Sequence, residues 1–230
     1  GGVTEVVQGG VPLGVGVTGQ VTARVQGTLS SQVQSTVDKR LVREGTVVKK
    51  GQTLVVLDSR DLREELARAQ AESENARAHL DRMKQLYGED AVSKQEKENA
   101  DRTFKVAEAS RRAALTKVSY TVVTAPFDGI ITEKKIEAGE IASPGQPLLK
   151  MEDPQRLRLE ATVAEGDLQA LSRGATIPVM IDALGSKTLP GTVAQILPAG
   201  DAATHTFLVK VELPPTPGLK TGMFGRMLVD

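Results

Sequence analysis

The chain contains 230 residues with 29 basic and 29 acidic side chains, so its net charge is zero, and it has no cysteine. Neutral charge with two Tyr, four Phe and no Trp argues against nucleic-acid binding, which requires a basic surface and stacking side chains. Disulfides and thiol chemistry are excluded, and no apolar run approaches the roughly 18 residues that cross a bilayer. Because no charged segment followed by an apolar stretch opens the chain, we expect any N-terminal signal or membrane anchor to be removed or absent.

The first predicted elements are β-strands. Between Val15 and Val25 small or apolar residues recur at every second position, which indicates a strand with one buried face. Residues 28–58 follow with short apolar stretches that are interrupted at Gly45 and Gly51, a spacing typical of tight β turns.

The composition changes abruptly after Asp58. From Arg60 to Val118, 25 of 59 residues are charged and none is proline. Apolar or small residues recur there at steps of four and three, which is the heptad pattern of a coiled coil. The seam consists of Leu62, Leu66, Ala69, Ser73, Ala76, Leu80, Met83 and Tyr87.

A second helix should follow the first. Gly88 ends the first helix, and Ser93 with Glu96 forms a capping box that begins the next. On the second helix Arg111 interrupts a weaker apolar pattern. That pattern consists of Ala100, Phe104, Ala107, Ala114 and Val118. We therefore predict an antiparallel coiled-coil hairpin whose helices are each about 40 Å long.

Residues 120–153 return to β character and repeat the first β segment 94 residues later. The identical pairs are Gly45/Gly139, Gly51/Gly145, Gln52/Gln146 and Leu54/Leu148, and the conservative pairs are Val42/Ile136, Val47/Ile141, Leu57/Met151 and Asp58/Glu152. Each half is too small to bury its own core, so the two halves should pack together as one β domain. The hairpin would then project from that domain.

The last part of the chain alternates apolar and polar residues in several short stretches from Leu157 to Val229, with one short helix predicted over Glu165–Leu171. Several short strands with one helix favour a small antiparallel barrel. The N-terminal strand is a candidate to complete this barrel.

Patterns that resemble catalytic or cofactor sites are weak. Gly14-x-Gly16-x-x-Gly19 matches a dinucleotide-binding fingerprint, but a strand rather than a helix is predicted after it. His79 and His205 are the only histidines, which argues against a zinc site, and no nucleophile with His and Asp at catalytic spacing is evident. The hairpin carboxylates alternate with basic residues, as on a solvated helix surface. We expect no catalytic residue, no bound cofactor and no metal site.

The paired half-motif with Ala125-Pro126-Phe127-Asp128-Gly129 resembles a biotinyl/lipoyl-type domain. The resemblance admits one alternative, a lipoyl or biotinyl carrier subunit of an enzyme, in which a lysine at the turn between the halves is modified. Here the hairpin replaces that turn, and the lipoyl-like dipeptide Asp38-Lys39 lies inside the first half. A coiled-coil scaffold unrelated to transport is a third possibility, which the hairpin tip motif described below disfavours.

Lipoyl halves split by a hairpin and followed by a barrel resemble the periplasmic adaptors, or membrane fusion proteins, of tripartite efflux pumps, of the HlyD/RND-adaptor type. In that family the hairpin tip carries Arg-x3-Leu-x6-Ser, which binds a TolC-like outer-membrane channel. Arg82-x3-Leu86-x6-Ser93 matches this motif without a gap. Ser35 departs from the family, because it aligns with Gly129 where glycine is usual in both halves.

The resemblance implies a mainly β protein with an α-helical coiled-coil hairpin. Its domains would be a split lipoyl-like domain (28–58 plus 119–153), the hairpin (59–118) and a β-barrel domain (5–27 plus 154–230). It further implies a non-enzymatic periplasmic protein, associated with the inner membrane, that links an inner-membrane transporter to the channel and self-associates into a ring. An RND transporter is favoured over an ABC transporter.

Overall fold

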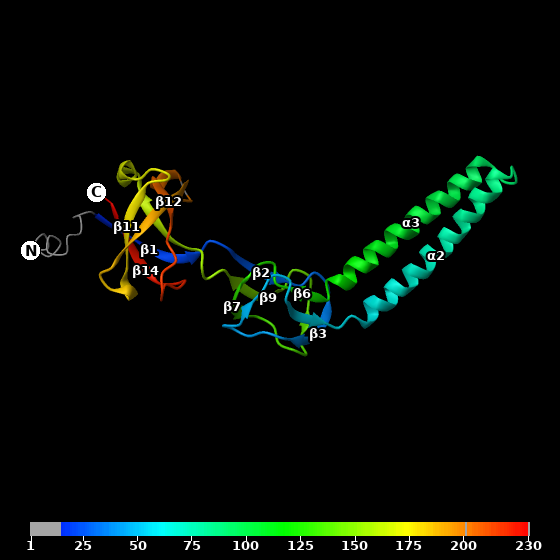
Figure 1. Ribbon diagram of the computed structural model, residues 1–230, viewed down its shortest axis with the longest axis horizontal. Helices are drawn as coiled ribbons and strands as arrows, with labels where there is room; N and C mark the ends of the chain where they lie inside the picture. The colour runs from blue at the N-terminus through cyan, green and yellow to red at the C-terminus, as the bar shows by residue number, and fades with distance from the viewer. Residues whose placement is uncertain (1–14, 201, 230) are drawn as a thin grey trace, which may run out of the picture. The chain divides into compact units, whose positions relative to one another are not determined.

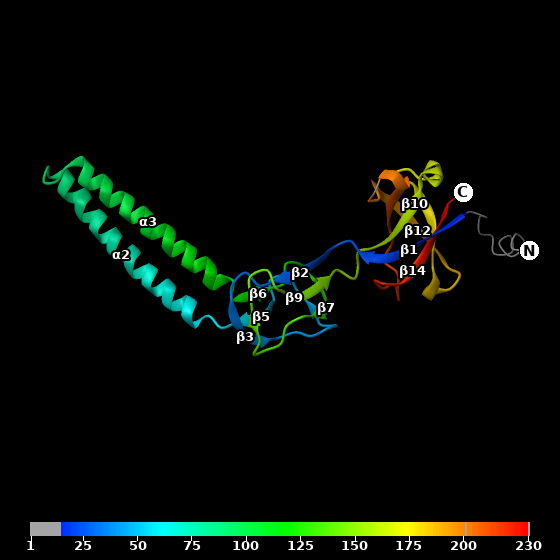
Figure 2. The same cartoon turned by 180° about the vertical axis from the view of Figure 1, so that it is seen from behind.

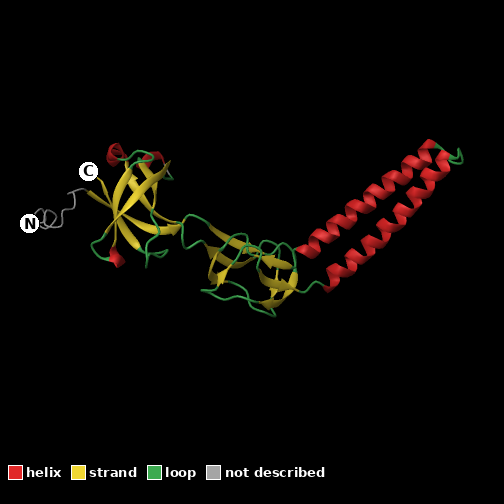
Figure 3. Cartoon of the chain, in the orientation of Figure 1, coloured by secondary structure: helices red, strands yellow, loops and turns green. Residues whose placement is uncertain are grey.

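The structure is a computed structural model that describes residues 15–200 and 202–229, so residues 5–14 of the predicted barrel segment lie outside the described part. Two compact units are present, one formed by Thr28–Met151 and the other by the segments on either side of it. Figure 3 shows that the helices of appreciable length all belong to the first of these units, and that the second is built of strands with short helical turns.

The flanking segments form a closed antiparallel barrel in which the N-terminal strand lies between the last strand and the first strand after the interruption. In spatial order the strands are β1 (Val15–Ala23), β10 (Leu157–Ala164), β13 (Thr206–Glu212), β12 (Thr188–Pro198), β11 (Thr176–Ile181) and β14 (Phe224–Val229). The prediction that the N-terminal strand completes a small barrel is confirmed.

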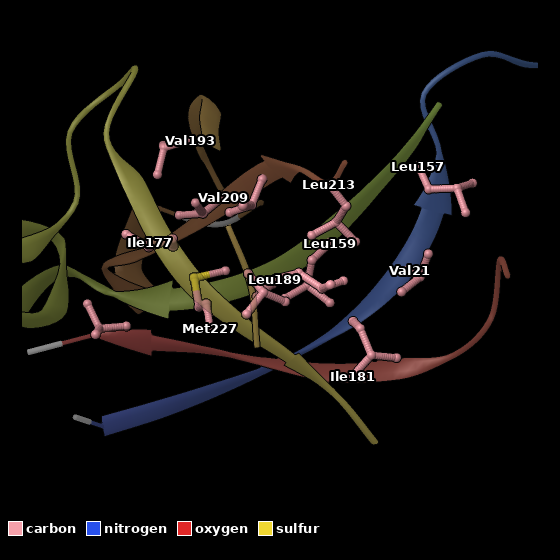
Figure 4. Close-up of a cluster of buried hydrophobic side chains, with 14 of the residues drawn as sticks. Val21, Leu157, Leu159, Ile177, Ile181, Leu189, Val193, Val209, Leu213 and Met227 are labelled. Carbon is pink, nitrogen blue, oxygen red and sulfur yellow. The ribbon is translucent and has the colours of Figure 1, made fainter. Parts of the chain in front are cut away.

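Alternation along each strand builds the barrel core. β10 alternates buried and partly or fully exposed residues throughout its length, so that Leu157, Leu159 and Val163 face inward. Figure 4 shows Val21, Leu159 and Met227 converging in the barrel interior. Burying one such large aliphatic side chain contributes about 1.5–3 kcal/mol, which is how a chain with few aromatic residues stabilises this unit.

Short helical turns connect the barrel strands. The helix predicted over Glu165–Leu171 is a 3₁₀ helix over Glu165–Ala170 (η1), flanked by extended residues on both sides. Two further 3₁₀ turns, η2 (Asp182–Leu184) and η3 (Ala202–Thr204), were not predicted from the sequence. Segments this short carry too little periodicity to be recognised.

Thr28–Met151 contains two four-stranded sheets that share the repeated motif. One sheet has the order β2 (Gln26–Ser30), β9 (Pro147–Glu152), β7 (Gly129–Lys134), β4 (Val47–Val48). The other has the order β6 (Val122–Thr124), β5 (Thr53–Leu57), β3 (Ser35–Arg40), β8 (Ile141–Ala142). Each sheet contains two strands from each half of the repeat, so neither half forms a sheet on its own.

Equivalent residues of the two halves have similar backbone conformations and make equivalent backbone hydrogen bonds. Gly45 and Gly139 have φ of 88° and 92°, and their N–H groups donate to Ile131 O and Val37 O, each at 2.8 Å. Positive φ favours glycine, which explains why the repeat keeps this residue type. The second shared glycine position, at 51 and 145, is also at positive φ.

The glutamine that is repeated in both halves, Gln52 and Gln146, holds its turn closed. The side-chain Oε1 of Gln52 accepts from Lys49 N at 3.0 Å, and that of Gln146 accepts from Ser143 N at 3.0 Å. Ser35, the departure from the family pattern, begins β3 just as Gly129 begins β7. Its hydroxyl donates to Asp58 O at 2.5 Å, so the serine is accommodated without a change in strand position.

The insertion between the halves is a helical hairpin of α2 (Arg60–Gly88) and α3 (Lys94–Ser119). The two helices lie side by side in both Figure 1 and Figure 2. With 29 and 26 residues, they extend over about 44 and 39 Å at 1.5 Å per residue. The helices run antiparallel, because Lys117 near the end of α3 faces Glu65 near the start of α2, Nζ to Oε1 3.9 Å.

Candidate functional site

Small side chains hold the two hairpin helices together. The residues most completely buried in the seam are Ala69, Ser73 and Leu80 of α2 and Ala100 and Ala114 of α3, each less than 9% exposed. Alanine at facing positions lets two helix backbones approach closely. The heptad pattern of α2 therefore marks its buried face, as predicted.

A polar layer interrupts this seam. Ser73 Oγ donates to Glu108 Oε2 at 2.8 Å, and Arg111 Nε donates to both carboxylate oxygens at 3.0 and 3.1 Å. These hydrogen bonds from Arg111, and then from Ser73, stabilise the carboxylate and lower the pKa of Glu108 from 4.5 to about 2. Arg111 thus breaks the apolar pattern of α3, as predicted, because it pairs with Glu108.

Capping interactions fix the turn at the hairpin tip. Glu96 N donates to Ser93 Oγ at 3.1 Å, and Ser93 N donates to Glu96 Oε2 at 2.8 Å, which is the predicted capping box. At the end of α2, Ala91 N donates to Leu86 O at 2.7 Å. Asp90 lies between these bonds with φ of 56°, a conformation that Asp tolerates better than most residues. The tip therefore has a defined backbone.

The three predicted tip residues lie at this end of the hairpin. Arg82 and Leu86 are one helical turn apart on α2, and side chains at that spacing are neighbours. Arg82 and Ser93 are exposed, and Leu86 is half-buried. The arrangement offers a guanidinium donor, a partly accessible apolar side chain and a hydroxyl that already caps α3. Such a surface suits a protein partner, since arginine is enriched among residues that dominate binding.

Two contacts between the hairpin helices were not predicted from the sequence, one at the tip and one further down the shaft. The Lys97 ammonium lies 4.3 Å from the ring centroid of Tyr87, and the Arg77 guanidinium lies 5.2 Å from that of Phe104. Tyr87 was assigned to the buried seam but is 37% exposed. That assignment was wrong, because the seam ends where α3 supplies a lysine rather than an apolar partner.

The residues of the weaker candidate sites are distributed over both units. Gly14 lies outside the described residues, while Gly16 and Gly19 lie within β1, which no helix follows. His79 is exposed on α2. His205 is exposed, and its Nδ1 lies 3.2 Å from Glu165 Oε2.

The carrier alternative is not favoured by the position of Lys39. This lysine lies within β3, where it pairs with Val56 of β5. A carrier lysine requires an exposed turn between the two halves, and here the chain enters α2 instead.

Within residues 15–200 and 202–229, no helix combines the length and the apolar character needed to cross a membrane.

Comparison with known proteins identifies both units. Residues 18–153 match the family model described as CzcB-like, barrel-sandwich hybrid domain, and residues 157–230 match the one described as CusB-like, beta-barrel domain. The first match alone covers more than half of the chain.

Relatives include two proteins of Pseudomonas putida. The solvent efflux pump periplasmic linker SrpA is 30% identical over 214 residues, which cover 86% of this chain and 56% of the relative. The antibiotic efflux pump periplasmic linker protein ArpA is 38% identical over 128 residues, which cover 56% of this chain and 34% of the relative. The chain thus spans about half the length of SrpA, and its alignment with ArpA covers about a third of that protein.

A solved structure shares the fold of this chain. A MacA-MexA chimera that contains the Pseudomonas aeruginosa MexA α-hairpin domain superposes with a TM-score of 0.83 at 22% identity, over 94% of this chain and 81% of the chimera. With a split sandwich, an inserted hairpin and a barrel that all match, the chain belongs to the membrane fusion protein family, the adaptors of RND type.

Proposed function

We propose that the chain is the periplasmic adaptor subunit of a tripartite efflux pump and links an inner-membrane transporter to a TolC-like outer-membrane channel. The observation that carries this proposal is the hairpin inserted between the two halves of the sandwich, with Arg82, Leu86 and Ser93 at its capped tip. The similarity to proteins described as efflux pump periplasmic linkers supports it. The role is mechanical rather than enzymatic.

The tip is proposed to bind the channel. Arg82 presents a planar fork of donors that suits carboxylates or backbone carbonyls of a partner. Leu86 supplies an apolar contact one turn further along α2. Ser93 keeps α3 capped and retains a hydroxyl proton that it can donate across the interface.

The barrel unit is proposed to face the transporter, and an RND transporter is favoured over an ABC transporter. Support comes from the match of residues 157–230 to a barrel family model that is named for RND systems. The periplasm is the proposed location, with association to the inner membrane through the transporter or an anchor outside these residues. For the complete adaptor we propose the three-domain division given above, at 28–58 plus 119–153, 59–118 and 5–27 plus 154–230.

Several copies are proposed to form a ring through their sandwiches. Val47 on β4 is 74% exposed and Ile141 on β8 is 62% exposed. These strands are the outer strands of the two different sheets, and the residues occupy equivalent positions in the repeat. An apolar side chain on each edge permits the β4 edge of one copy to contact the β8 edge of the next, a head-to-tail contact that closes into a ring if the rotation allows.

Efflux complementation tests the proposal. The full-length gene with Arg82→Asp or Leu86→Asp should fail to restore drug resistance to a strain that lacks the adaptor, although both proteins accumulate normally. Val106→Asp is the matched control, since Val106 is 63% exposed on α3 away from the tip and the change is of the same kind. Full resistance with both tip variants would contradict the tip assignment.

A further inference from the structure

At the tip end of the hairpin seam, Lys97 of α3 contacts the aromatic ring of Tyr87 of α2. Tyr87 follows Leu80 and Met83 at seam spacing, but α3 presents Lys97 to it rather than an apolar side chain. The Lys97 ammonium lies 4.3 Å from the centre of the Tyr87 ring, within the range of an attractive cation–π interaction. The ring is 37% exposed, so the pair lies at the solvent boundary of the tip.

This pair joins the last turn of α2 to the first turn of α3. Tyr87 directly follows Leu86 and lies five residues after Arg82 on the same helix. Lys97 directly follows Glu96, whose side chain completes the cap on Ser93. The contact therefore links the helix turn that carries two proposed binding residues to the cap that contains the third. Its loss would free the end of α2 to rotate and fray while leaving the seam below it packed.

We propose that Tyr87 and Lys97 are positioning residues of the hairpin tip, whose contact fixes the direction in which Arg82 and Leu86 project toward the channel. The inference rests on the proposed function, because it concerns the geometry of the same site. Neither side chain needs to touch the channel for this effect. We therefore expect channel binding to require a cation at position 97 in contact with an aromatic ring at position 87, but not lysine and tyrosine specifically.

The hairpin contains a matched control for this contact. Arg77 of α2 lies over Phe104 of α3, with the ring centre 5.2 Å from the guanidinium carbon. It is the same type of interhelical interaction, with the cation and the ring exchanged between the helices, but it lies ten residues before Tyr87 on α2. Removal of the Arg77 charge should weaken the shaft of the hairpin without reorienting the tip.

A channel-binding assay distinguishes the role of the Tyr87–Lys97 contact from that of the Arg77–Phe104 contact. The full chain, immobilised through its C-terminus, is exposed to a TolC-type outer-membrane channel in nanodiscs. Lys97→Met keeps the aliphatic stem and removes the charge, whereas Tyr87→Leu removes the ring. Each substitution should weaken channel binding about two- to fivefold, which is the effect expected for the loss of one exposed cation–π contact. Lys97→Arg and Tyr87→Phe keep a cation and a ring and should bind as the wild type does. Arg77→Met should also bind as the wild type does.

A second measurement detects the contact without any channel. The ring current of Tyr87 should shift the side-chain methylene protons of Lys97 upfield in the NMR spectrum, and Tyr87→Leu should abolish that shift. Far-UV circular dichroism at 222 nm verifies that each variant keeps its helices. Absence of the shift in the wild-type protein would overturn the inference directly.

Arg82→Asp in the same binding assay distinguishes failure of the proposed tip site from failure of the proposed positioning role. Loss of binding with Arg82→Asp but not with Lys97→Met or Tyr87→Leu would uphold the tip site and refute the positioning role. Wild-type binding by Arg82→Asp would refute the tip site itself, and the positioning role with it. Failure of Lys97→Arg to restore binding would also count against positioning, because it would mean that the lysine itself contacts the channel.

Discussion

The internal repeat makes a quantitative prediction for the two leucines at equivalent positions, Leu54 in β5 and Leu148 in β9. Both are 0% exposed, and their carbonyl oxygens accept equivalent hydrogen bonds, from Leu41 N and Lys135 N, each at 2.9 Å. Substitution of either by alanine removes three buried carbon groups, worth about 2.4 kcal/mol at roughly 0.8 kcal/mol each. A residual cavity raises the cost into the range of about 2–5 kcal/mol.

We expect Leu54→Ala and Leu148→Ala each to destabilise Thr28–Met151 by about 3 kcal/mol, and to differ by less than about 1 kcal/mol because their surroundings are related by the repeat. Since each sheet contains strands of both halves, either substitution should loosen both halves together. Leu41→Ala is the control: Leu41 is 56% exposed, so its loss should cost under about 0.5 kcal/mol.

Native-state hydrogen exchange read by mass spectrometry is the appropriate assay, because a chain with two units need not unfold in one step. A loss of 3 kcal/mol corresponds to exchange roughly a hundredfold faster in the protected amides of β3 and β7. The barrel strand β13 serves as an internal reference and should not change. If one leucine were costly and the other tolerated, or if only one half exchanged faster, the two halves would not form a shared core and the reasoning would be wrong.

Three further predictions concern the hairpin, the ring and the barrel. The lowered pKa of Glu108 means that its ion pair with Arg111 stabilises the hairpin above pH 4.5 and that this stabilisation is lost as the pH falls toward 2; urea unfolding followed at 222 nm should show this loss, reduced in Glu108→Gln. Val47→Lys should weaken self-association in sedimentation velocity experiments, and an unchanged association constant would argue against the β4 edge as an interface. Gly19→Val should destabilise the barrel by at least about 1–3 kcal/mol, because a Cβ there would lie 2.5 Å from a backbone carbonyl oxygen of β10. Gly166→Ala, whose Cβ meets nothing within 4 Å, should leave the thermal midpoint unchanged.

The sequence contains enough information to predict the sandwich and the barrel because their turns require particular residues. Gly45 and Gly139 occupy positive φ, and Gln52 with Gln146 closes the following turn in both halves. Such constraints act within a few residues of the chain, so they leave a regular spacing that can be recognised. The order of strands in the two sheets could not be predicted in this way. It depends on which long-range strand pairing buries both halves, and no spacing along the chain encodes that pairing.

The hairpin shows where periodicity stops being informative. A heptad pattern reports which face of a helix is buried, but not which residue of the partner helix lies at the same level. Ser73 fits the α2 pattern and Arg111 breaks the α3 pattern, yet both belong to one hydrogen-bonded layer centred on Glu108. Tyr87 fits the pattern and is still exposed, because its partner is Lys97.

The Ser73–Glu108 hydrogen bond and the Tyr87–Lys97 contact control different properties of the hairpin. The hydrogen bond from Ser73 of α2 to Glu108 of α3 favours one alignment of the helices, since sliding by one turn would separate Ser73 from Glu108, whereas Arg111 lies on the same helix as Glu108 and would move with it. The alignment is thus set in the shaft, at Ser73, whereas the geometry of the tip is set four turns further along α2, at Tyr87. Because the two determinants are separated along the helix, substitutions at one should be nearly additive with substitutions at the other. Stability of the shaft and direction of the tip are therefore separable properties, and a variant such as Lys97→Met can impair binding while the hairpin stays folded.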